Sequence, residues 1–278
     1  MGKPHSRDAA WEHPCARLAR DRVRPGREGG FTLVELVMVI LLLGVMATFS
    51  SQFIGIGTQI YGDASRREQL MSDARFAMER LNRELRDAVP GSVQVEASNS
   101  GGQGACLRFW PIATASRYLG SVASTGLSIV TPSVLPKKNE DLAIVYPLAS
   151  TGLLNQGCLQ GSCTARVTDV GSDVSGALPL TLSNGFVKDS PGQRIYFASR
   201  QVRYCVQGAV LTRASAAIGT DITTSPTALM TEHIRPAVYY FYRDPAAFSP
   251  SEVGLRLVFE QRGESVSFNH KLEVLNVP

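Results

Sequence analysis

The sequence predicts an α+β fold in which a long amino-terminal helix precedes an antiparallel β-sheet domain. Three patterns indicate it: an apolar run over residues 36–49, an apolar stripe with helical spacing over residues 70–88, and short extended segments between turn residues after Pro90. The chain has 278 residues, which is enough for one large core or two small ones.

The first element is the apolar run. Residues 36–49 read LVMVILLLGVMATF, and starting at Phe31 the segment is about long enough to cross most of a bilayer as a helix. Six arginines precede it, and no charged residue follows Glu35 until Asp63. Basic residues before an apolar helix keep that end in the cytoplasm, so the sequence predicts a single-pass anchor with the remainder exported.

Glu35 distinguishes between the possible roles of this segment. A cleaved secretory signal is one alternative, because residues 45–47 (Val-Met-Ala) form a small-x-small site that would leave Thr48 as the new amino terminus. A plain membrane anchor is another. A carboxylate costs about 2.5–3.5 kcal/mol at the centre of a membrane helix and less near its end. A cleaved signal has no use for a carboxylate, whereas in a plain anchor Glu35 would be an interfacial residue at the mouth of the segment.

Residues 30–36, Gly-Phe-Thr-Leu-Val-Glu-Leu, resemble the cleavage and assembly motif of type IV pilins and type II secretion pseudopilins. The resemblance implies cleavage between Gly30 and Phe31 by a prepilin peptidase, and methylation of the new amine on Phe31. It also implies that Glu35 pairs with the Phe31 ammonium of a neighbouring subunit. Such pairing would make a carboxylate tolerable in an apolar environment.

The same resemblance implies an organisation and a set of partners. Residues 1–30 would be the cleaved leader (Val23 is an alternative start that would shorten it), residues 31–54 the transmembrane and filament-core half of the helix, residues 55–89 its amphipathic half, and residues 90–278 a globular domain in the periplasm. The partners would be the prepilin peptidase, other major and minor pilins, an inner-membrane assembly platform, and the lipid bilayer before assembly.

The implied function is that of a minor pilin in a type IV pilus of the mannose-sensitive haemagglutinin (MSHA) type, at its initiation or its tip. The amphipathic helix around residues 74–86 resembles minor pilins of that system. Two alternatives stay open: a J-type minor pseudopilin of a type II secretion system, and a filament-mounted adhesin or binding module.

The second half of the helix carries the apolar stripe. Gly55, Gly57 and Gly62 predict a pliable stretch rather than a stop, since the helical pattern resumes after them and ends at Pro90-Gly91. The stripe needs a sheet to cover it, and its members are Leu70, Ala74, Ala77, Met78, Leu81, Leu85 and Ala88.

Beyond Pro90 the pattern predicts strands. Gln207-Gly208 and Arg262-Gly263 are expected hairpin turns. Apart from one early strand at residues 142–146, residues 112–191 are expected to be rich in loops. The predicted strands are residues 92–96, 106–111, 142–146, 200–206, 209–213, 237–243, 255–260 and 265–274.

The number of cysteines is consistent with export from the cytoplasm. Cys15 lies in the leader, which leaves four that allow three disulfide pairings. The short spacing favours Cys158–Cys163, and Cys106–Cys205 would then join early and late strands. Zinc is the alternative, but a Cys-x4-Cys spacing without a nearby His suits it poorly.

The composition gives no basis for nucleic-acid binding, catalysis or a cofactor. The formal net charge is +4, but residues 1–30 hold seven of the 28 Lys and Arg and four of the 24 Asp and Glu, so the rest of the chain is close to neutral. No catalytic, cofactor or metal-binding motif is present among residues 31–278. Asp169 and Asp173 are expected in a solvated turn rather than in a calcium site.

Overall fold

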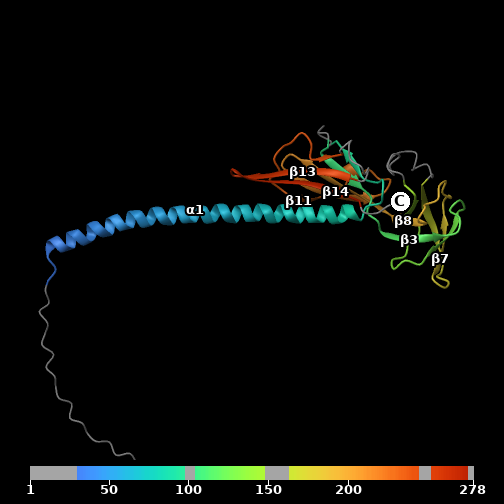
Figure 1. Cartoon of the computed structure of the whole chain (residues 1–278), viewed down its shortest axis with the longest axis horizontal. Helices are drawn as coiled ribbons and strands as arrows, with labels where there is room; N and C mark the ends of the chain where they lie inside the picture. The colour runs from blue at the N-terminus through green and yellow to red at the C-terminus, as the bar shows by residue number, and fades with distance from the viewer. Residues whose placement is uncertain (1–29, 98–103, 148–162, 244–251, 275–278) are drawn as a thin grey trace, which may run out of the picture. The chain divides into compact units, whose positions relative to one another are not determined.

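The computed structural model describes residues 30–97, 104–147, 163–243 and 252–274. The chain divides into two compact units, Met1–Ile60 and Tyr61–Pro278, which we describe in turn. It has the predicted α+β architecture, with one long amino-terminal helix, α1 (Leu33–Arg86), and antiparallel sheets after it (Figure 1).

In the first unit α1 begins with a side-chain cap. The Thr32 hydroxyl oxygen accepts a hydrogen bond from the Glu35 backbone N–H at 3.3 Å, and the Thr32 carbonyl accepts one from Leu36 N–H at 3.1 Å. This satisfies donors that the first helical turn would otherwise leave unpaired. The helix then continues through Gly55 and Gly57, as the resumed periodicity predicted.

In the second unit the remainder of α1 buries the predicted stripe. All seven stripe residues, from Leu70 to Ala88, are buried. The helix ends at Arg86, and Gly91 takes a positive φ of 72° in the turn that follows Pro90. The periodicity therefore predicted both the buried face and the approximate end of the helix.

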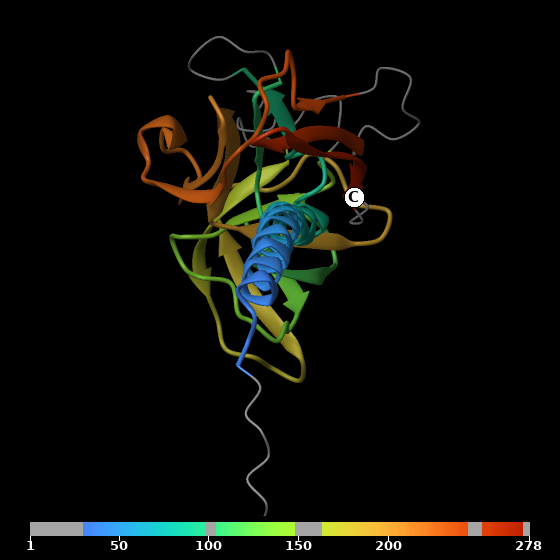
Figure 2. The ribbon, with the colours of Figure 1, turned by 90° about the vertical axis from the view of Figure 1, so that its left-hand side faces the viewer.

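Two sheets cover the apolar stripe of α1. The five-stranded sheet has the order β1-β2-β9-β10-β11, and the three-stranded sheet has the order β12-β13-β14. Figure 1 shows β11, β13 and β14 beside the last part of α1, and Figure 2 shows the same region along the helix. The strands are β1 (Gln94–Glu96), β2 (Cys106–Phe109), β9 (Arg200–Gln207), β10 (Val210–Ala217), β11 (Thr227–Thr231), β12 (Phe241–Tyr242), β13 (Glu252–Gln261) and β14 (Glu264–Glu273).

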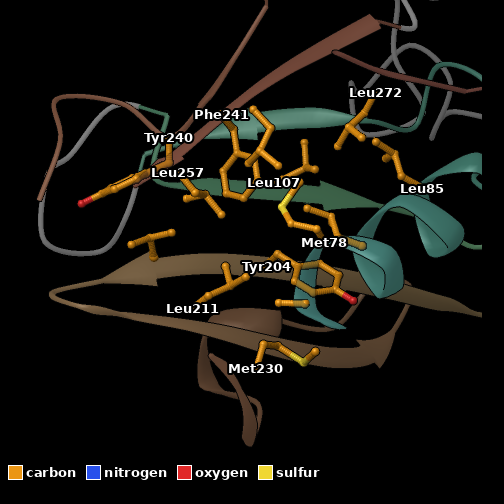
Figure 3. Close-up of a cluster of buried hydrophobic side chains, with 14 of the residues drawn as sticks. Met78, Leu85, Leu107, Tyr204, Leu211, Met230, Tyr240, Phe241, Leu257 and Leu272 are labelled. Carbon is orange, nitrogen blue, oxygen red and sulfur yellow. The ribbon is translucent and has the colours of Figure 1, made fainter. Parts of the chain in front are cut away.

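The helix and both sheets share one core (Figure 3). Met78 and Leu85 from α1 meet side chains of the five-stranded sheet and of the three-stranded sheet, so the stripe is sandwiched by apolar groups from distant parts of the chain. Further members of this core are Leu107, Tyr204, Leu211, Met230, Tyr240, Phe241, Leu257 and Leu272. Burial of this kind contributes about 25 cal/mol per Å² of apolar surface.

A second, separate core fills a closed six-stranded barrel with the strand order β3-β4-β7-β6-β5-β8. Residues such as Ile129, Val167 and Phe197 are fully buried inside it. Its strands are β3 (Thr114–Leu119), β4 (Gly126–Val130), β5 (Leu142–Val145), β6 (Thr164–Val170), β7 (Ala177–Leu182) and β8 (Arg194–Ala198).

The barrel is an insertion between two neighbouring strands. All six of its strands lie in sequence between β2 and β9, which pair directly with Cys106 opposite Cys205. A small third cluster around Trp110 lies where the barrel joins the rest of the unit: Val89 N–H donates to Trp110 C=O at 2.8 Å, and Ile112 N–H donates to Asp87 C=O at 2.9 Å. The base of the barrel is therefore hydrogen-bonded to the end of α1.

Three sequence-based expectations were wrong. Residues 112–147 and 163–191 supply five of the six barrel strands, of which only β5 was predicted, because short strands that obtain their partners from distant segments leave little local signal. Residues 237–243 form only the two-residue β12, since Pro236 lacks an amide hydrogen and the Tyr240 and Phe241 N–H groups donate to Gly104 C=O instead. The first hairpin turn is one residue later than expected, because Gln207 pairs with Val210. The Arg262-Gly263 turn is confirmed, with φ of 50° and 89°.

A partly buried ionic network joins α1 to the five-stranded sheet. Glu84 accepts hydrogen bonds from Tyr204 OH at 3.0 Å, Arg213 Nε at 2.9 Å and Arg80 Nε at 3.2 Å. The Glu84 side chain is 18% exposed, so its charge is largely removed from water and depends on these three donors.

This network predicts an alkaline loss of stability. Burial and the Glu84 carboxylate raise the pKa of Tyr204. A group whose pKa is higher in the folded state than in the unfolded state stabilises the fold fully below its unfolded pKa, which is about 10 for tyrosine. This stabilisation is lost as the pH rises further. We expect the free energy of unfolding of Tyr204→Phe to fall less steeply above pH 10 than that of the wild type, by up to about 1.4 kcal/mol per pH unit. Urea unfolding in detergent micelles measures it.

The control is Tyr61→Phe, because Tyr61 is 77% exposed and lies outside the Glu84 network. Its alkaline slope should match that of the wild type. An unchanged slope in Tyr204→Phe would show that the Tyr204 hydroxyl does not couple proton release to unfolding.

Candidate functional site

The candidate processing site lies immediately before α1. Gly30 and Phe31 precede the first helical turn and are both exposed, with the Phe31 side chain 80% accessible. The peptide bond between them is therefore outside the hydrogen-bonded helix. A protease that cleaves there would not have to unwind a helical turn.

Glu35 lies in the first turn of the helix. Its backbone N–H is held by Thr32, and its side chain is exposed without an ion-pair partner among the described residues. A carboxylate in the first turn interacts favourably with the helix dipole. The Thr32-x-x-Glu35 spacing is a capping-box pattern, a local signal in the sequence that could have placed the start of the helix at this position.

Between Leu36 and Phe49 the helix surface is apolar on every side. The helix is long and apolar enough to cross a membrane, and nothing in the structure buries its apolar span. The exposed large residues are Leu36, Val37, Met38, Val39, Ile40, Leu41, Leu42, Leu43, Val45, Met46, Phe49, Phe53, Ile54, Ile56, Ile60 and Tyr61. A continuous surface of this kind requires lipid or other apolar helices around it.

The four cysteines after residue 30 belong to the second unit. A disulfide joins Cys106 of β2 to Cys205 of β9, which is one of the three pairings that the four cysteines allowed. Cys163 is buried and disulfide-bonded, whereas Cys158, its predicted partner, lies outside the described residues. The Cys158–Cys163 pairing therefore stays a prediction.

The two aspartates that the sequence placed in one turn have separate roles. Asp169 belongs to β6, and the Lys138 ammonium, 2.8 Å away, lowers the pKa of its carboxyl. Asp173 accepts hydrogen bonds from Thr131 OH and from Gly176 N–H, which lower the pKa of its carboxyl. Within residues 30–97, 104–147, 163–243 and 252–274 no group of three or more His, Cys, Asp or Glu side chains is placed to hold a metal ion.

One segment of the chain matches a known family model. The family model of the prokaryotic N-terminal methylation motif matches residues 26–51, which contain Gly30, Phe31, Glu35 and the apolar half of the helix. No curated protein and no solved structure matches the chain. The motif indicates a precursor of the type IV pilin or pseudopilin kind, a structural rather than an enzymatic class, and the apolar helix fits the membrane anchor of such a precursor.

Proposed function

We propose that this chain is a minor pilin of a type IV pilus of the MSHA type, cleaved between Gly30 and Phe31 and methylated on the Phe31 amine. The observation that carries the proposal is the methylation motif on a helix whose apolar half is uncovered on all sides. Such a helix is stable in the bilayer before assembly and among the helices of other pilins afterwards. Prepilin peptidase, those pilins and the inner-membrane platform are the expected partners.

Glu35 has a specific part in this proposal. In the precursor its carboxylate has no partner within the described chain, and after cleavage the ammonium of Phe31 would lie one turn away along the helix axis or on a neighbouring subunit. Pairing between subunits would fix the register of adjacent helices, because a buried carboxylate is tolerated only beside a positive charge.

The size of the exported part supports a place at the initiation complex or the tip. Residues 90–278 contain two sheets and a closed barrel, and a head of that bulk is difficult to repeat along a closely packed filament. The pattern Ala74 to Leu81, followed by Arg83 to Arg86, resembles that of MshO, a minor pilin of the MSHA system. A J-type minor pseudopilin has a similar helix, so the neighbouring genes are the direct way to separate the two machines.

The amino terminus of the membrane-fraction protein tests the proposal. We expect intact-mass and peptide mass spectrometry to find a chain that begins at methylated Phe31. A chain beginning at Thr48 would mean a secreted protein and would overturn the proposal. A chain that retains residues 1–30 would mean an ordinary anchored domain, and would overturn it as well.

A second candidate function, a filament-mounted binding module, is favoured by the inserted barrel. The barrel has its own closed sheet and its own core, and both of its connections leave from adjacent strands. The helix and the two sheets would then be the part that assembles, while the barrel is displayed.

Replacement of the barrel separates the two candidates. Phe109 pairs with Val202, so an Asn-Gly turn in place of residues 112–199 would join β2 to β9 as a simple hairpin. For a displayed binding module we expect normal filament number with at least about tenfold lower adhesion. Loss of filaments with a correctly folded head would instead assign the barrel to initiation. Filament counts and cell adhesion are measured together.

A further inference from the structure

A concave surface lies on the three-stranded sheet, on the side away from the core. It has a volume of about 260 Å³ and is lined by residues 235–239 together with Arg256 and Val258 of β13. On β13 the alternate residues Leu255, Leu257 and Phe259 are buried in the core, whereas Arg256 is exposed on the opposite face. The surface belongs to neither the processing site nor the barrel.

The backbone holds this surface in a defined shape. Arg235 N–H donates to Val258 C=O at 2.7 Å, and Arg256 N–H donates to Tyr240 C=O at 2.8 Å, so both ends of the segment 235–240 are fixed to β13. Pro236, between these ends, has no N–H with which to continue the ladder. The segment therefore leaves the strand plane and forms one wall of the concavity.

Tyr239 forms an aromatic part of this wall and is supported from behind. Tyr239 is 45% exposed as a residue, and its ring meets the Tyr242 ring edge-on at 5.6 Å. The Tyr242 ring in turn lies against Gly254 of β13, where an added Cβ atom would overlap the ring carbons. Gly254 thus provides the space that lets Tyr242 hold Tyr239 in place.

Two arginines, Arg235 and Arg256, line the same concavity as Tyr239. The Arg256 side chain has no ion pair or side-chain hydrogen bond within the part of the chain that the structure describes. Arg235 is 57% exposed and lies 3.6 Å from Glu260, a distance that leaves most of its donors available. The neighbouring Val238 is 84% exposed. The surface therefore combines an aromatic face, positive charge and a small apolar edge.

We propose that this surface binds a saccharide that carries a carboxylate. A guanidinium matches the two oxygens of a carboxylate with parallel hydrogen bonds, which makes Arg256 its natural partner. The exposed face of Tyr239 offers an apolar platform for the C–H side of a sugar ring. The volume of about 260 Å³ suits one such ring. The proposal does not depend on assembly into a filament.

Binding of defined oligosaccharides to the full chain in detergent micelles tests the proposal. The probes are trigalacturonate, the uncharged galactotriose and tetraglutamate, measured by titration calorimetry. We expect trigalacturonate to bind at least about tenfold more tightly than either of the others. Arg256→Gln and Tyr239→Ala should each weaken its binding by about tenfold or more, while Arg67→Gln, which changes an exposed arginine on α1, should leave it unchanged.

Each contrary outcome overturns the proposal in a distinct way. Equal binding of galactotriose would mean that the carboxylate is not recognised, and equal binding of tetraglutamate would mean a general anionic or protein-binding surface. Absence of binding by all three probes would reject a ligand site. Because Arg256 is exposed, Arg256→Gln should keep the wild-type thermal midpoint, so a loss of binding in that variant cannot be attributed to unfolding. None of these outcomes bears on the amino terminus measured for the proposed function.

Discussion

Glu35→Ala should remove the protein from filaments while leaving it in the membrane. Loss of one partner from a buried ion pair costs about 3–5 kcal/mol, which corresponds to a decrease of about a hundredfold or more in incorporation. Membrane retention should persist, because removal of a carboxylate only makes the helix easier to place in lipid. The ratio of epitope-tagged protein in sheared filaments to that in membranes measures the effect.

Glu68→Ala is the matched control for this prediction. Glu68 is an exposed glutamate of the same helix, but it lies beyond the apolar span that ends at Tyr61. We expect its incorporation to equal that of the wild type. Normal incorporation of Glu35→Ala would refute the pairing with the Phe31 ammonium, even if methylated Phe31 were found at the amino terminus.

The second large effect is expected from the Cys106–Cys205 disulfide. The two cysteines are separated by 99 residues, and the loop between them contains the whole barrel. Removal of such a disulfide typically lowers the free energy of unfolding by about 2–5 kcal/mol, since the unfolded chain gains conformational entropy when the loop is no longer closed. We expect the double substitution Cys106→Ala and Cys205→Ala to lower the free energy of unfolding by that amount.

The fluorescence of Trp110 reports this loss of stability directly. It is the one tryptophan of residues 31–278, and it is buried where the barrel joins β2 and the end of α1. Its fluorescence during urea unfolding in detergent micelles should shift to a lower midpoint in the double variant. Reduced wild-type protein should unfold at a midpoint no higher than that of the variant, because reduction also breaks the disulfide of Cys163. A change below about 1 kcal/mol would show that the β2–β9 pairing holds without its covalent link.

Local patterns predicted the amino-terminal helix and a hairpin turn near the end of the chain. The stripe from Leu70 to Ala88 is buried as its spacing predicted, because helical periodicity depends only on residues three or four apart. Arg262-Gly263 forms the expected turn for the same reason, since its conformation is decided by the two residues themselves. The motif around Gly30, Phe31 and Glu35 is likewise contiguous, so it is recognisable without a fold.

Only the tertiary structure revealed the barrel and the surface around Tyr239. The barrel closes by pairing β3 with β8, strands more than seventy residues apart, and no local pattern specifies which distant segment supplies the partner. The pairing of Glu84 with Arg213 and Tyr204, and the support of Tyr239 by Gly254 through Tyr242, arise in the same way. The sequence by itself determined the apolar half of the helix and the methylation motif at its start, because those properties reside in neighbouring residues. The shape and the chemistry of the head were decided by contacts between residues far apart in the chain.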